Sequence, residues 1–151
     1  MASNARKYTT RRSAIAKALS DKFALIDGRG IYHTAVAQTS PRLKFWDEIE
    51  EFPAIHLNAG SESRQYQTGG FKDRFLNITV RCYVNEEDAV TALDELLEDV
   101  ETVIESNSKL TYHDRLGLEQ STHQITVLSI DTDEGVLEPL GVGEILIEVR
   151  Y

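Results

Sequence analysis

The chain has few of the residues that mark secreted, membrane-bound or redox-active proteins. Its 151 residues include one cysteine, Cys82, which excludes an intramolecular disulfide and a multi-cysteine metal site. No segment approaches the ~20 consecutive apolar residues of a membrane-spanning helix. The first ten residues, MASNARKYTT, lack the apolar core of a secretory signal. We therefore expect a protein made in a reducing cytoplasm, with no membrane segment.

Residue patterns that carry chemistry are equally scarce. The four histidines are His33, His56, His113 and His123. None lies at i, i+4 from another or beside the cysteine, so a zinc site has little support. The Gly-Arg-Gly at 28–30 lacks the Lys-Ser/Thr of a phosphate-binding loop. We predict no catalytic residue, no cofactor site and no metal site, and hence no enzyme.

Charge is unevenly distributed along the chain. Residues 1–22 hold six basic residues against Asp21, a local charge of +5, which leaves −14 on the rest of a chain whose net charge is −9. The six are Arg6, Lys7, Arg11, Arg12, Lys17 and Lys22. A basic stretch on an acidic body is either a nucleic-acid contact or, more commonly, a solvated helix face.

Hydrophobic spacing predicts two main helices. The first runs from Thr9 to about Ile26, with Thr9 or Thr10 as its cap and Gly28 and Gly30 after its end. The second follows Asn85 as cap and buries a stripe made of Ala89, Leu93, Leu96, Val100 and Ile104. Nine acids and no Lys or Arg lie between Glu86 and Glu105. Such a face is either simply solvated or a repelling wall along which DNA slides.

Alternating patterns predict the strands. Residues 75–84 place Leu76, Ile78, Val80, Cys82 and Val84 on one face, and we expect Asn77, Thr79, Arg81 and Tyr83 on the outer face. Residues 54–57 form a short strand after Pro53, and 58–74 form a flexible loop or a hairpin arm. In 123–133 the inward face switches near Leu128, which indicates a bulge. The closing strand pairs antiparallel with this segment, with Tyr151 included in the pair, and buries Ile145, Ile147 and Val149.

Several segments together resemble the tail terminator proteins of long-tailed bacteriophages, in the family of minor tail protein U. The resemblance extends over nearly the whole chain and rests on AIAKAL, EIEEFPAIHLNAGSE, FLNITVRCYV, DAVTALDELLEDVETVIES and EPLGVGEILIEVRY. It implies one α+β domain over 1–151, a mixed or mostly antiparallel sheet with two main helices packed on it. It also implies a virion protein at the head-proximal end of the tail. That family forms hexameric rings that stop tube polymerisation and present a surface to the head.

The resemblance directs attention to two sets of residues. In 58–74 the candidate assembly contacts are Arg64, Tyr66, Phe71, Lys72 and Arg74, a mixture of aromatic and charged side chains suited to an interface. In a ring, the candidate channel-lining residues are Glu95, Glu98, Asp99 and Glu105. The implied partners are other copies of the chain, the tail tube protein and a head completion or connector protein. DNA would pass through the ring without sequence-specific binding.

Two other functions fit the same composition. Another neck or head–tail joining protein would share this size and order of elements. A small acidic enzyme or ligand-binding domain, with a pocket that no motif reveals, belongs to a different class. A sixfold ring would separate the first two from the third, because such a ring is unusual for a small enzyme.

Overall fold

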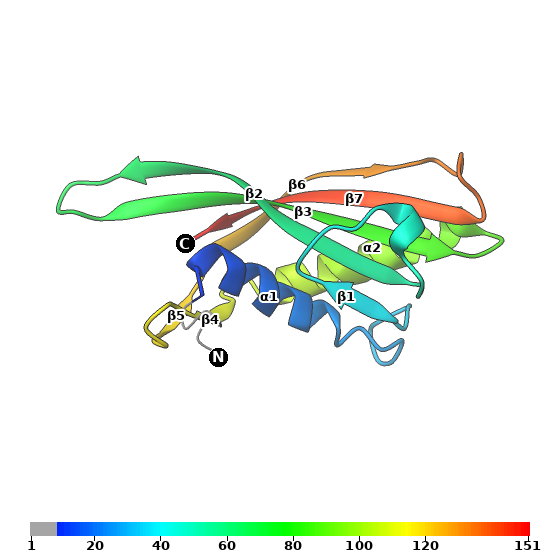
Figure 1. The fold of residues 1–151 in the computed structure, drawn as a ribbon, viewed down its shortest axis with the longest axis horizontal. Helices are drawn as coiled ribbons and strands as arrows, with labels where there is room; N and C mark the ends of the chain where they lie inside the picture. Colours follow the sequence, from blue (N-terminus) through cyan, green and yellow to red (C-terminus); the bar gives the residue numbers. More distant parts are fainter. Residues whose placement is uncertain (1–8) are drawn as a thin grey trace, which may run out of the picture.

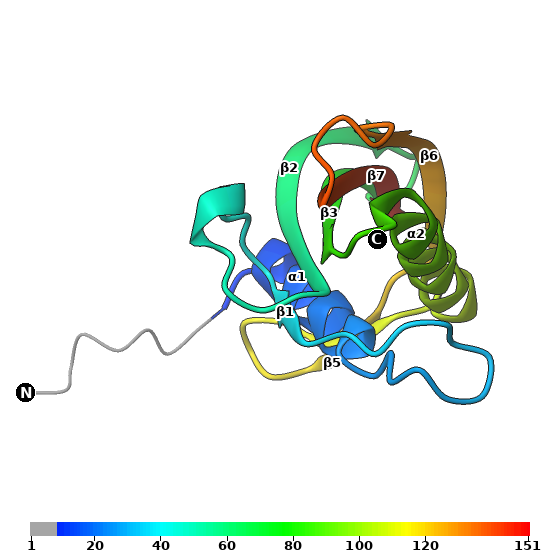
Figure 2. The ribbon, with the colours of Figure 1, turned by 90° about the vertical axis from the view of Figure 1, so that its right-hand side faces the viewer.

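The fold is a curved sheet with two helices on one face (Figure 1). The structure is a computed structural model that describes residues 9–151, so Arg6 and Lys7 of the basic stretch lie outside it. The strands follow the order β1-β2-β3-β7-β6; β1 is parallel to β2, and the other pairs are antiparallel. Figure 2 shows the sheet arching over both helices. The predicted α+β class with a mixed, mostly antiparallel sheet is confirmed.

The elements have the following bounds. The helices are α1 (Arg11–Phe23) and α2 (Ala89–Ser106), and η2 (Trp46–Glu48) is a short 3₁₀ turn. The large sheet comprises β1 (Gln38–Ser40), β2 (Ala54–Tyr66), β3 (Lys72–Asn85), β6 (Gln124–Thr132) and β7 (Leu140–Arg150). A separate pair is formed by β4 (Thr111–His113) and β5 (Glu119–Ser121).

Both helices are capped by side chains at their N-termini. The hydroxyl of Thr10 accepts from Ser13 N at 3.1 Å at the start of α1, as predicted. In α2 the cap is Asp88, which accepts from Thr91 N at 3.3 Å. The prediction of Asn85 was wrong because β3 continues through that residue, and the helix begins only at Ala89.

The helices cover the apolar face of the sheet with a single core. The predicted stripe of α2 is buried, as are Ile15, Leu19 and Phe23 of α1. The five apolar residues predicted to point inward from β3 are at most 1% exposed. Cys82 is one of them, and burial raises the pKa of its thiol to about 12, so it serves as a small core residue.

Tyr83 does not face solvent as its place in the alternation predicted. It is 1% exposed, because it packs with Ile49 and Ala54 in a second apolar cluster on the opposite face of the sheet. Its hydroxyl donates to the carbonyl of Lys44 at 3.3 Å. The segment between β1 and β2 therefore covers part of the sheet face that the helices leave open.

The strands β2 and β3 extend well beyond the helices as a hairpin (Figure 1). The predicted strand 54–57 was too short: β2 has 13 residues and pairs with β3 as far as Tyr66 opposite Lys72. A register shift between Ala59 and Glu62 marks an irregularity where the polar part begins. At the tip, Gly69 and Gly70 have φ of 88° and 83°, which glycine adopts without steric cost. We call the paired residues 58–74 the arm.

The closing strand β7 lies inside the sheet, between β3 and β6. Ile145, Ile147 and Val149 are fully buried, as predicted. The predicted bulge in β6 is present as a register shift between Val127 and Ser129. The prediction that Tyr151 pairs with β6 needs correction. Its N–H and C=O exchange hydrogen bonds with Arg74 of β3 at 2.9 and 3.0 Å.

Candidate assembly surfaces

The tip of the arm exposes two aromatic side chains. Tyr66 and Phe71 are 72% and 73% exposed. The Nζ of Lys72 lies 5.6 Å from the centre of the Tyr66 ring, and Gln67 N donates to Phe71 O at 2.7 Å across the turn. These residues lie outside the core, so their conformation is set by the hairpin and its own contacts.

The base of the arm is fixed to the C-terminal residue. The hydroxyl of Tyr151 donates to Glu62 Oε1 at 2.5 Å, and Arg64 Nε donates to Glu62 Oε2 at 2.9 Å. The guanidinium of Arg74 lies 5.4 Å from the Tyr151 ring centre, and the Tyr112 ring meets that ring edge-on. Arg64 and Arg74 therefore support the base, while Tyr66, Phe71 and Lys72 occupy the tip.

These contacts shift the proton affinities of the pair. Burial alone would raise the pKa of Glu62, but the hydrogen bonds from Tyr151 and Arg64 outweigh it and hold the pKa below its ordinary value. Burial and the neighbouring carboxylate raise the pKa of Tyr151 to about 12. Sequence reasoning did not identify Glu62, because no local pattern relates it to a tyrosine 89 residues away.

The predicted channel-lining acids divide into two groups. Glu95, Glu98 and Glu105 are exposed on α2, and we call these three residues the acidic face. Asp99 does not belong to it. It is 1% exposed, because it lies within the buried stripe, next to Val100 and one turn after Leu96. In the described fold the Asp99 side chain is therefore not on the exposed surface that carries the other three predicted residues.

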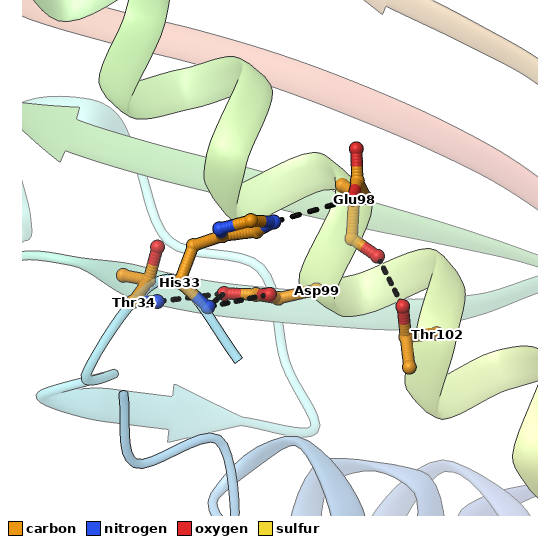
Figure 3. Close-up of polar contacts among 5 residues, drawn as sticks. All are labelled: His33, Thr34, Glu98, Asp99 and Thr102. Carbon is orange, nitrogen blue, oxygen red and sulfur yellow. Dashed lines mark hydrogen bonds and ion pairs between the residues drawn. The ribbon is translucent and has the colours of Figure 1, made fainter. Parts of the chain in front are cut away.

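Asp99 instead holds the segment that follows α1 (Figure 3). Its carboxylate accepts from the backbone N–H of Thr34 at 2.8 Å and from that of His33 at 2.9 and 3.1 Å. Beside it, Nε2 of His33 lies 3.2 Å from Glu98 Oε1, and this contact raises the pKa of His33. The arrangement satisfies backbone donors, which is a structural role.

An open hollow of about 940 Å³ lies beside the outer edge of β2. Its lining includes Arg12, Lys17, Arg42, Asn58 and Ala59. Arg12 donates to the carbonyl of Ala59 at 3.3 Å and also to that of Gly60. Arg12 and Lys17 thus share one surface, while Arg11 does not line this hollow.

The described part of the chain contains no group of three or more His, Cys, Asp or Glu that could hold a metal ion. His56 is fully buried beside Tyr83, and burial lowers its pKa. Asp114, beside His113, builds the β4–β5 turn by accepting from Leu116 N and Leu118 N. Within residues 9–151, no helix has the length and apolar character needed to cross a membrane.

A small α+β domain with an exposed aromatic arm, and without a metal-binding cluster among its described residues, has the features of a structural assembly subunit. Residues 9–151 match the family described as Bacteriophage Tail Tube Terminator Protein, and the chain belongs to this family. It is 30% identical over 149 residues to Tail tube terminator protein p142 of Escherichia phage T5, covering 93% of this chain and 92% of that protein. The chain is thus a structural component of a phage virion, as its sequence resemblance implied.

The fold also occurs in a solved particle. A chain from the virion of a native gene transfer agent particle superposes with a TM-score of 0.55 at 10% sequence identity. The match covers 91% of this chain and 93% of that one. At this identity the comparison shows a shared fold across almost the whole domain.

Proposed function

We propose that copies of this chain form a closed ring, a hexamer, on the end of the completed tail tube. The ring stops tube polymerisation and presents a surface to the head or its connector. Its role is assembly rather than catalysis. The family match supports the terminator role, and the T5 relative is itself named a tail tube terminator. The number of six subunits is taken from the sequence resemblance, which implies a hexameric ring.

The observation that best supports an assembly role is the arm. Two aromatic side chains more than 70% exposed, near Arg64, match the aromatic and arginine enrichment of interfaces over ordinary surface. The arm is also held at its base by the bond between Tyr151 and Glu62. A preorganised contact element loses less conformational entropy on binding. We therefore assign Tyr66, Phe71 and Lys72 to contacts with a partner, with Arg64 and Arg74 supporting them.

The acidic face has a separate role in this proposal. Helix α2 carries no Lys or Arg, and Glu95, Glu98 and Glu105 are exposed along it. Phosphates that pass such a surface meet no cations to hold them. We place this face towards the channel, where DNA moves through the ring without sequence-specific binding.

The arm is tested by deleting Gln65–Gly70 and replacing the chain in phage particles with the shortened version. The deletion removes the tip and leaves the core untouched, so the isolated protein should keep its urea unfolding midpoint while tail completion is lost. Leu116→Ala is the matched control, since Leu116 is 68% exposed on the β4–β5 turn. It should support normal phage yield. A normal yield with the deletion would remove the arm from assembly.

A further inference from the structure

The sheet has two long outer edges that no strand of the same chain covers over residues 9–151. On one side, β6 pairs only with β7. On the other side, β1 covers β2 only from Ala54 to His56, which leaves 58–66 uncovered. Such edges are templates for pairing with another chain, and proteins usually blunt them with proline, lysine or short length. The edge strand β6 has nine residues, no proline and no lysine.

The direction of the strands determines how two copies can meet. The strands β2, β3, β7 and β6 alternate in direction. With four alternating strands, β6 runs opposite to β2. In a rotationally symmetric ring, equivalent strands of all copies have the same direction relative to the ring axis. The β6 edge of one copy therefore meets the β2 edge of the next as an antiparallel pair. Because the two edges are different surfaces, the contact is head-to-tail, and such contacts form a ring when the rotation between neighbouring copies closes.

Charge on the two edges is complementary in this arrangement. The exposed acids at the end of β6 and in the turn that follows it are Asp131, Glu134 and Glu138. The uncovered part of β2 begins beside the basic hollow formed by Arg12, Lys17 and Arg42. In an antiparallel pair the end of β6 lies next to the start of this part of β2. The acidic turn of one copy then faces the basic hollow of the next.

At the start of the uncovered part of β2, Arg12 already donates to the carbonyls of Ala59 and Gly60, so pairing between copies would rely on the backbone groups beyond Gly60. In the described residues, neither Arg12 nor Arg42 takes part in an ion pair, whereas Lys17 pairs with Asp21 at 3.0 Å. The edge strand β6 also presents Leu128 and Ile130, which are 48% and 41% exposed. Pairing would cover this apolar surface.

We propose that a second copy of this chain is the occupant of both edges: β6, Gln124–Thr132, of one copy pairs antiparallel with residues 58–66 of β2 in the next, and the acidic turn lies over the basic hollow. This inference rests on the proposed ring and names the surfaces that close it. The nine residues of each edge place Thr132 opposite Asn58 and Gln124 opposite Tyr66. Ser129 then lies opposite Ser61, and both are exposed.

Single cysteines at these two positions test the pairing. We would make Ser61→Cys and Ser129→Cys as separate full-length proteins, incorporate each alone or both together into tail-bound rings, and oxidise them. Facing Cα atoms of an antiparallel pair lie about 4.5–5.5 Å apart, within disulfide range. The mixed sample should give a cross-linked dimer band on a non-reducing gel, and each single variant should give none. The buried Cys82 is common to all samples and acts as an internal control.

A charge exchange provides a second readout. Asp131→Arg and Arg42→Glu should each abolish assembly alone, and the double variant should restore it, because the attraction then acts between reversed charges. Rings of normal size without a mixed cross-link would overturn the edge pairing and leave the terminator role intact. Cross-links in a single variant would also overturn it, since they require like edges to meet. Absence of any assembly larger than a monomer, even on tails, would overturn both proposals.

Discussion

Truncation of the closing strand is the sharpest test of the fold. We consider a protein that lacks Ile145–Tyr151. This removes most of β7, which is hydrogen-bonded to β3 on one side and to β6 on the other. The truncation leaves residues 124–130 of β6 without the strand that pairs with them in the described residues 9–151, and it opens the sheet above α2. It therefore acts on the centre of the sheet rather than on an edge.

The magnitude follows from burial. Ile145, Ile147 and Val149 are fully buried and Tyr151 is 7% exposed. At roughly 1.5–3 kcal/mol for each fully buried side chain, the four together are worth roughly 6–12 kcal/mol. The lost ladder hydrogen bonds add about 0.5–1.5 kcal/mol each. A domain of this size is stable by only about 5–15 kcal/mol, so the truncated chain should not fold.

The assay is expression followed by size-exclusion chromatography and urea unfolding. The truncated chain should aggregate, because the exposed edges of β3 and β6 are free to pair with other chains. Ile147→Ala provides the graded comparison: it should remain folded and lose about 2–5 kcal/mol of unfolding free energy. A soluble truncated protein with a cooperative transition would refute the reasoning and show that β7 is not required by the monomer core.

Three further predictions follow from the same structure. Leu96→Ala empties a fully buried site and should lower the unfolding free energy by about 2–5 kcal/mol; an unchanged urea midpoint would place α2 outside the core. Tyr151→Phe removes the bond to Glu62. Because the folded pKa of Glu62 is lowered, wild-type stability falls as the pH drops through that value. Because that of Tyr151 is raised to about 12, stability also falls as the pH rises above about 10. The Tyr151→Phe variant should lose less stability than the wild type at both the acidic and the alkaline end of the pH range. Identical stability profiles of the two proteins against pH would contradict the contact. Changing the acidic face to lysines should leave rings that form but slow DNA ejection, whereas unaltered ejection kinetics would place that face outside the channel.

The regular elements were the predictable part of the fold. In β3 and β7, alternation identified the buried face, because a period of two has one meaning once one side of a sheet is covered. In α2 the spacing of Leu93, Leu96 and Val100 identified the core stripe, because residues three and four positions apart lie on one face of a helix. The bulge near Leu128 was also visible, because the apolar positions change face there. These signals are local and repeat along the chain.

The features that sequence reasoning missed depend on distant segments. Tyr83 is buried because residues around Ile49 cover the far face of the sheet. Asp99 is accommodated in the buried stripe of α2 because the segment at His33 supplies backbone donors to its carboxylate. The sequence left 58–74 open as a flexible loop or a hairpin arm, because its polar strands bury little and are defined by pairing with each other. The spacing of residues along one segment does not reveal contacts with a distant segment. The sequence therefore identified the regions that carry the candidate surfaces, but not the contacts that their residues make.

The most direct test of the terminator role is the length of tails made without this chain. Phage particles would be produced in cells in which its gene is interrupted, and tail lengths would be measured by negative-stain electron microscopy. If a ring of this chain stops tube growth, the cells should contain tails of variable and excessive length that are not joined to heads. Complementation with the intact chain should restore a single length. Tails of uniform normal length attached to heads in its absence would contradict the proposed function.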